Sequence, residues 1–212
     1  MNKTTFVTAY RVLAGALILS ATGYSIALKW GFPTFSLSNF FSYFTQLSNL
    51  YAAAVLLAGL WFARRPPAPF YESARGAAVL YMSITGIVYE VLLAHADSLV
   101  HGTPTYSNWI LHRIMPVALL LDWLYLAPRT RLDWTHMLRW LAFPIAYLVY
   151  TLVRGPLVDW YPYPFVDPRP HGYLNVAAHC GAITIGGIAF AALVVWLGNR
   201  PRGARAIRIG GA

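Results

Sequence analysis

The sequence predicts an all-α, polytopic membrane protein built as a bundle of six transmembrane helices. Of its 212 residues, 58% are hydrophobic and only 11% are charged. A soluble domain is about 25% charged, and a disordered chain is poor in aromatic residues, whereas Phe, Trp and Tyr make up 16% of this chain. The net charge of +9 is carried by basic residues scattered among apolar runs. We therefore expect no nucleic-acid partner, because a nucleic-acid binder gathers such residues on one surface.

Six segments are long enough to cross the hydrocarbon core of a bilayer, which takes about 20 apolar residues of helix. The predicted spans are 6–28, 38–62, 74–96, 108–127, 135–154 and 173–198. They leave no room for a separate soluble domain. We expect a six-span transmembrane domain over 1–199 and a basic cytoplasmic tail over 200–212. The single cysteine, Cys180, excludes an intrachain disulfide.

The distribution of Lys and Arg predicts the orientation of the spans. With the N-terminus inside, twelve basic residues fall on the cytoplasmic side and four on the outer side. Cytoplasmic segments of membrane proteins carry such an excess of Lys and Arg. Both termini are therefore expected in the cytoplasm.

Four of the predicted spans carry polar residues near their outer ends, where such residues are costly and therefore informative. In the second span they recur at helical spacing, so a continuous helix would present them on one face. We expect them to line a pocket that opens outward, with Thr45, Glu90, His112 and His179 each roughly 6–11 Å below the outer membrane boundary at the 1.5 Å rise of a helix. The whole set is Ser38, Ser42, Thr45 and Asn49; Ser83, Gly86 and Glu90; Asn108, His112 and Arg113; and Asn175 and His179.

A proline-rich loop over 155–172 is expected to cap this pocket, because prolines stiffen the backbone. The loop offers several side chains with polar groups. They are Asp159, Tyr161, Tyr163, Asp167 and His171.

A hydroxyl and an imidazole at one depth are the minimum for nucleophilic acyl transfer. Thr45 would attack an ester and His112 would take its proton. Asn49, Arg113 or a backbone N–H would stabilise the oxyanion, and Glu90 would orient His112 or His179. This chemistry requires no cofactor, and the expected partners are a lipid or fatty-acyl ester substrate and the membrane lipids.

Structural roles compete with this hypothesis at each position. Thr45 would more often form a hydrogen bond between helices, and His112 would more often be a packing residue. Glu90 must be protonated or paired in a membrane, and Arg113 or Arg154 would neutralise it. Near the inner end, Asp122 is expected to pair with Arg11.

Two other function classes stay open. In a small transporter or a lipid- or ligand-binding membrane protein, Glu90 would be the titrating group. In a zinc-dependent lipid hydrolase, histidines and carboxylates at the outer side would bind the metal, although their spacing matches no zinc signature. These residues are His95, His101, His112, His171 and His179, with Glu90, Asp97, Asp159 and Asp167.

Three motifs resemble the landmarks of the androgen-induced family of six-span membrane proteins, which includes the androgen-dependent TFPI-regulating protein and bacterial relatives. They are FFSYFTQLSNL at 40–50, NWILHRIMPVALLLDW at 108–123 and WYPYPFVDP at 160–168. The resemblance implies an intramembrane hydrolase of fatty acid esters of hydroxy fatty acids. Carried over by motif, it implies Thr45 as nucleophile and His112 as its histidine. Similarity to the bacterial members implies a bacterial plasma (inner) membrane.

Overall fold

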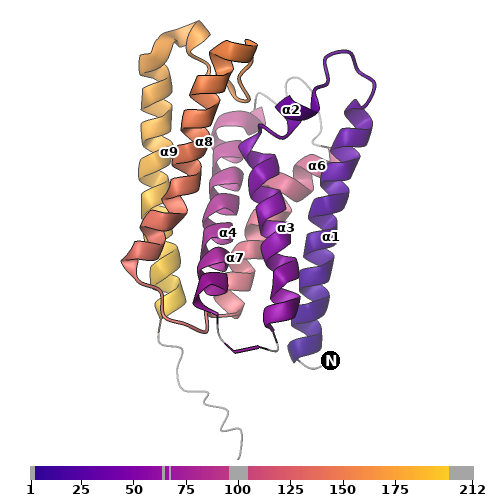
Figure 1. Cartoon of the computed structure of the whole chain (residues 1–212), viewed down its shortest axis with the longest axis vertical. Helices are drawn as coiled ribbons and strands as arrows, with labels where there is room; N and C mark the ends of the chain where they lie inside the picture. Colours follow the sequence, from indigo (N-terminus) through magenta and orange to yellow (C-terminus); the bar gives the residue numbers. More distant parts are fainter. Residues whose placement is uncertain (1–2, 64, 67, 96–104, 201–212) are drawn as a thin grey trace, which may run out of the picture.

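The computed structural model describes residues 3–63, 65–66, 68–95 and 105–200. Within these ranges the chain is all-α, as predicted, and its long helices run side by side in alternating directions (Figure 1). Five of the helices in the described part of the chain are long and apolar enough to cross a membrane, which indicates an integral membrane protein. They are α1 (Lys3–Lys29), α3 (Phe44–Phe62), α4 (Pro69–Val88) with the π-helical turn η1 (Tyr89–Leu93), α8 (Trp134–Val158) and α9 (Pro168–Asn199).

The fourth predicted span is helical but interrupted. It consists of α6 (Tyr106–Trp109), the π-helical turn η2 (Ile110–Ile114) and α7 (Met115–Tyr125), which follow one another directly. Pro116 explains the widened turn, because a proline has no N–H and its ring clashes with the carbonyl four residues earlier, here that of His112.

The second predicted span, 38–62, is wrong as one continuous helix. The short helix α2 (Leu37–Phe40) ends before a turn, and Tyr43 is extended (φ −76°, ψ 132°) ahead of α3. The Ser42 hydroxyl donates to the Ser38 carbonyl at 2.6 Å within this turn. Ser38 and Ser42 therefore do not share a helical face with Thr45 and Asn49, and Thr45 lies in the first turn of α3 instead of about two turns into a helix that begins at residue 38.

The proline-rich loop is shorter than predicted, because helices extend into it from both sides. α8 continues to Val158, and Pro168 opens α9 at the position where proline suits a helix. Gly172 (φ 74°, ψ 169°) interrupts the helical geometry of α9, so its first residues form a short helical turn and the predicted sixth span follows this kink. Between α8 and α9 lie residues 159–167, with the 3-10 turn η3 (Pro164–Val166). The predicted basic tail falls mostly outside the described residues, which end at Arg200.

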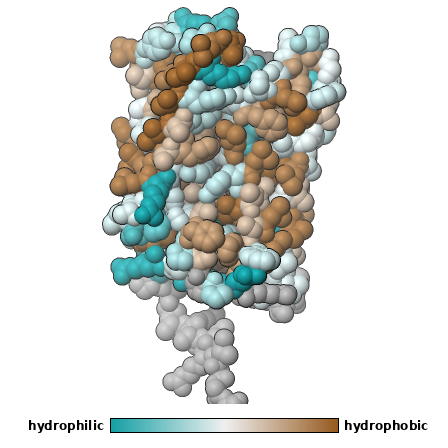
Figure 2. All heavy atoms as spheres, in the orientation of Figure 1, coloured by the Kyte–Doolittle hydropathy of each residue, from teal (hydrophilic) through white to brown (hydrophobic). Residues whose placement is uncertain are grey.

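Helix α4 lies within the bundle and packs against α3, α7, α8 and α9. Helix α1 lies at the edge of the bundle and packs against α3 (Figure 1). Leu80 and Met82 of α4 are fully buried. Figure 2 shows apolar side chains over much of the visible flank, with hydrophilic ones gathered mainly toward the two ends. This surface is the one expected of a bundle surrounded by lipid.

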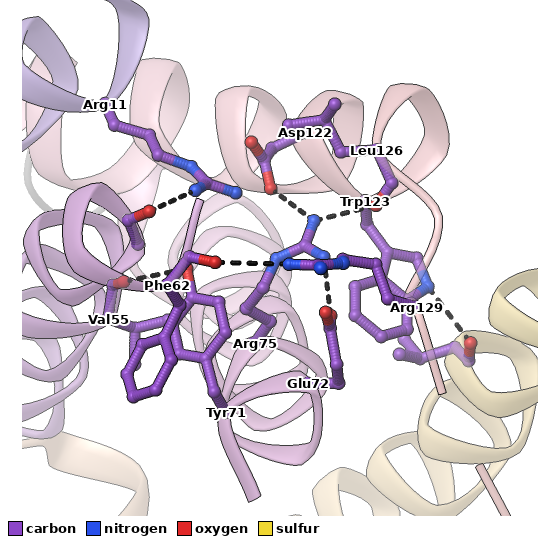
Figure 3. Close-up of polar contacts among 12 residues, drawn as sticks. Arg11, Val55, Phe62, Tyr71, Glu72, Arg75, Asp122, Trp123, Leu126 and Arg129 are labelled. Carbon is purple, nitrogen blue, oxygen red and sulfur yellow. Dashed lines mark hydrogen bonds and ion pairs between the residues drawn. The ribbon is translucent and has the colours of Figure 1, made fainter. Parts of the chain in front are cut away.

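A cluster of buried charged side chains lies at the end of the bundle that holds the N-terminus (Figure 3). Arg75 contacts Glu72 and Asp122, each at 2.8 Å, and donates to the Leu126 carbonyl. The predicted pair of Asp122 with Arg11 is therefore wrong, because Arg75 of α4 occupies the position beside Asp122.

Arg11 stabilises the end of α3 instead. Its Nη1 atom donates to the Gly59 carbonyl at 2.9 Å, and Arg129 donates to the carbonyls of Phe62 and Arg65. The Gly59 and Phe62 carbonyls also accept the backbone N–H groups of Ala63 and Arg65, so the guanidinium groups add a second hydrogen bond to each. A Cβ at Gly59 would lie 2.5 Å from Arg11 Nη1, so a side chain there would displace the guanidinium from this position.

Candidate active site

Thr45 is the second residue of α3, whose first N–H groups lack partners within the helix. The N-cap residue Tyr43 offers no side-chain hydrogen bond. Two distant tyrosine hydroxyls accept these hydrogen bonds instead. Tyr147 accepts from the Phe44 N–H and Tyr163 from the Thr45 N–H, both at 3.2 Å.

The hydroxyl of Thr45 lies within hydrogen-bonding distance of His112. Thr45 Oγ1 is 3.2 Å from His112 Nε2 and 3.3 Å from the Tyr163 hydroxyl. The Tyr89 ring stacks on the imidazole, with centroids 4.1 Å apart. The structure thus brings together two residues from the second and fourth predicted spans, and Thr45 is only 7% exposed.

Two π-helical turns position this pair. Tyr89 begins η1 and His112 lies in η2, and such turns are frequent at functional sites. Gly86 allows α4 to approach η2 closely, because a Cβ there would lie 3.0 Å from Pro116 Cβ and 3.2 Å from the His112 carbonyl oxygen. The predicted face of Ser83, Gly86 and Glu90 is lost where η1 begins: Ser83 is buried, whereas the Glu90 side chain is 48% exposed.

Thr45 lies where two cavities meet, and Tyr89 and Tyr163 also line both. The smaller cavity, of about 120 Å³, lies among α4, α8 and α9 and is mostly apolar. The larger, of about 510 Å³, has polar residues in its wall, among them Lys29, Gln46, Asn108 and His112. An extended molecule that enters both cavities would pass the Thr45 hydroxyl.

Glu90 is paired with Arg113, at 2.6 Å between Oε1 and Nε. Of the two arginines expected to neutralise it, Arg113 does so, while Arg154 donates to Asn39 Oδ1 at 2.6 Å. The Arg113 guanidinium also lies 4.7 Å from the centre of the Trp109 ring. The structure therefore places Glu90 and Arg113 in an ion pair beside the site.

Asn49 is fully buried and connects two elements of the site. Its amide donates to the carbonyls of Thr45, at 2.9 Å, and Leu111, at 3.2 Å. These bonds hold α3 against η2 and use the donors that were predicted to stabilise an oxyanion.

His179 lies farther along the ring stack that begins at Tyr163. Its Nδ1 atom is 2.9 Å from the Asn175 carbonyl oxygen, and its ring lies 6.4 Å from that of Phe165, which stacks on Tyr163. The sequence grouped His179 with Thr45 by depth alone, and the structure does not bring it to the Thr45 hydroxyl.

The acidic residues of the cap gather around one arginine. Asp159 and Asp167 both contact Arg169, at 2.6 Å and 2.7 Å, and this hydrogen bonding lowers the pKa of the Asp167 carboxyl. Tyr161 lies in the segment between α8 and α9, and His171 lies near the start of α9. Among the residues that the structure describes, no three His, Cys, Asp or Glu side chains are placed to hold a metal ion; Asp97 and His101 lie outside those residues.

Sequence reasoning missed the parts played by Tyr89 and Tyr147. Both are tyrosines within apolar spans, with no spacing that sets them apart from packing residues. Tyr163 was expected only as a residue of the cap. The sequence offered no signal for these parts, because the start of α3 at Phe44, where a capping side chain is lacking, is evident only in the structure.

The chain matches no family model, no curated protein and no solved structure.

Proposed function

We propose that the protein is a six-span membrane hydrolase of lipid or fatty-acyl esters, with Thr45 as nucleophile and His112 as general base. The observation that carries this proposal is the 3.2 Å contact between Thr45 Oγ1 and His112 Nε2, in a buried position where two cavities meet. In this proposal α6, η2 and α7 together form one more crossing, the fourth in chain order, which brings the number of crossings to six. Both termini are cytoplasmic and the site lies near the outer leaflet of a bacterial plasma membrane.

The reaction follows from the geometry. His112 Nε2 takes the hydroxyl proton as Thr45 Oγ1 bonds to the ester carbonyl carbon, and the carbonyl electron pair moves onto its oxygen. Collapse of this intermediate breaks the bond to the alcohol, which leaves with the proton from Nε2. Water then gives a proton to His112 Nε2 as its oxygen bonds to the acyl carbon. The bond from that carbon to Thr45 Oγ1 breaks, Oγ1 takes the proton from Nε2, and the carboxylic acid leaves.

The two cavities suit the two halves of such an ester. The apolar cavity accepts an acyl group, because its walls offer few hydrogen-bonding groups. The polar cavity accepts the alcohol part and supplies the water for the second step. Hydrolysis of such an ester is also the activity that the family resemblance implies.

The test uses the detergent-purified protein and a panel of acyl esters of increasing chain length. We expect wild type to hydrolyse at least one ester. Thr45→Val and His112→Ala should lose about 10²-fold or more of kcat, the scale of removing a nucleophile or base. Thr45→Ser, which keeps a hydroxyl, should retain activity.

Thr22→Ala is the matched control, because this buried threonine of α1 lies outside the site. A wild type inert to every ester, or a Thr45→Val variant as fast as wild type, would show that the proposal is wrong. Flux into proteoliposomes that depends on Glu90 but not on Thr45 would favour the transporter instead. Stoichiometric zinc in an active preparation would favour the metal-dependent hydrolase.

A further inference from the structure

Tyr163 reaches the reacting atoms from the segment between α8 and α9. Its hydroxyl lies 3.3 Å from Thr45 Oγ1 and accepts the Thr45 N–H at 3.2 Å. Its ring is held by stacking on Phe165, with planes 5° apart and centroids at 5.1 Å, and by an edge contact with Tyr43. The hydroxyl is therefore fixed beside the nucleophile and between the two cavities.

The hydrogen-bond inventory gives the direction of the Tyr163 O–H. A phenol has one proton to donate, and its oxygen already accepts from the Thr45 N–H. Thr45 Oγ1 lies within reach of that proton, and its own proton is directed to His112 Nε2 in the proposed reaction. The Tyr163 O–H thus points toward Thr45 Oγ1, the atom that bonds to the ester carbon in the tetrahedral intermediate.

We infer that Tyr163 is a further catalytic residue, whose O–H donates to the oxyanion of the tetrahedral intermediate. The oxyanion is separated from Thr45 Oγ1 by a single carbon, so a small rotation of the phenol O–H brings it from one oxygen to the other. The Tyr163 oxygen keeps its hydrogen bond to the Thr45 N–H during this rotation. That N–H belongs to the first turn of α3, where the helix dipole favours negative charge.

The Tyr163 phenol keeps its proton at neutral pH. Burial raises the pKa of Tyr163 to about 12, against an ordinary value of 10.0. It therefore acts as a neutral hydrogen-bond donor at neutral pH, as tyrosines do in other oxyanion sites.

The competing explanation is that Tyr163 only caps α3, and Tyr147 is the matched control for it. The Tyr147 hydroxyl also accepts a first-turn N–H of α3, from Phe44, and it donates to the Ser42 carbonyl at 2.9 Å. It therefore has the same capping role, but its proton is bonded away from Thr45. Substituting Phe for each tyrosine separates capping from catalysis.

The inference rests on the proposed function, so the experiment measures both. Wild type, Thr45→Val, Tyr163→Phe and Tyr147→Phe are assayed on the best ester of the panel, and thermal unfolding is recorded for each. Tyr163→Phe should lower kcat by about 10²-fold, the scale of losing one oxyanion donor, with KM changed less than threefold. Tyr147→Phe should lose a comparable amount of thermal stability but less than tenfold in kcat.

A second measurement uses an alkyl boronic acid, which forms a tetrahedral adduct with a reactive hydroxyl. Tyr163→Phe should weaken inhibition by the boronic acid about 10-fold or more, while binding of a non-cleavable ether analogue of the ester should change less than threefold.

Three results would decide against the inference. A Tyr163→Phe variant within threefold of wild type, or one no slower than Tyr147→Phe, overturns the role of Tyr163 while Thr45 and His112 keep theirs. If Tyr163→Phe weakens inhibition by the boronic acid and binding of the ether analogue equally, Tyr163 acts in substrate binding and not on the oxyanion. If wild type is inert, or Thr45→Val is fully active, the proposed function is wrong and the role of Tyr163 is wrong with it.

Discussion

Arg75 shows what a single buried charge does in this bundle. It is 5% exposed and forms ion pairs with Glu72 and Asp122, which are themselves 2% and 8% exposed. The sequence identified Asp122 as a residue that needs a cation, because a lone carboxylate in a membrane is costly. It gave the wrong partner, since Arg11 and Arg75 both lie near the same end of the bundle and only packing decides between them.

Arg75→Met should destabilise the protein by about 3–5 kcal/mol, the scale of removing one member of a buried ion pair. Both carboxylates would lose their cation, and each would then have to be protonated or left unpaired. Thermal unfolding in detergent measures the change. Arg139→Met is the matched control, because this arginine is exposed on α8, and we expect less than about 0.5 kcal/mol there. Equal effects at the two positions would contradict a structural role for the buried cluster.

At the scale of elements, the helices were predictable but their interruptions were not. Apolar content and length predicted every long helix, because these follow from local composition. The break before Phe44 depends on hydroxyls of Tyr147 and Tyr163, which lie more than 100 residues away in the chain. Pro116 lies within a predicted span, but the sequence did not show that the π-helical turn before it packs closely on α4 at Gly86.

This last contact predicts that a side chain at position 86 disturbs the site. In Gly86→Val, contact with Pro116 and the His112 carbonyl would displace η2, and with it the imidazole, from Thr45 Oγ1. We expect at least a 10-fold loss of ester hydrolysis, because catalysis requires the base within hydrogen-bond reach.

Gly186→Val is the control for this change, because no atom lies within 4 Å of a Cβ built at Gly186 of α9. Its activity should stay within twofold of wild type, and circular dichroism should show that both variants are helical. Full activity of Gly86→Val would mean that η2 does not depend on the close approach of α4.

For the whole molecule, composition predicted a membrane protein and charge predicted its orientation in the bilayer, but neither predicted which helices contact one another. Thr45 and His112 lie 67 positions apart in the chain, and their contact depends on α3 and η2 both packing against α4. Nothing in the spacing of polar residues distinguishes this arrangement from one in which the second and fourth spans are not neighbours. The 1.5 Å rise gave an expected depth along each span but no position around the bundle.

The asymmetry of Lys and Arg leads to the last prediction, that the end of the bundle holding Thr45 faces the outside of the cell. The single Cys180 can be replaced by Ala, so that one introduced cysteine reports each end. Thr34 is exposed in the segment between α1 and α2, at the end that holds the site, and Ala63 is exposed just after α3, at the opposite end. A membrane-impermeant maleimide should label Thr34→Cys in cells with an intact plasma membrane, and Ala63→Cys only after that membrane is opened. The reverse labelling would place the Thr45–His112 pair at the cytoplasmic face, and an ester substrate would then have to reach it from the inner leaflet.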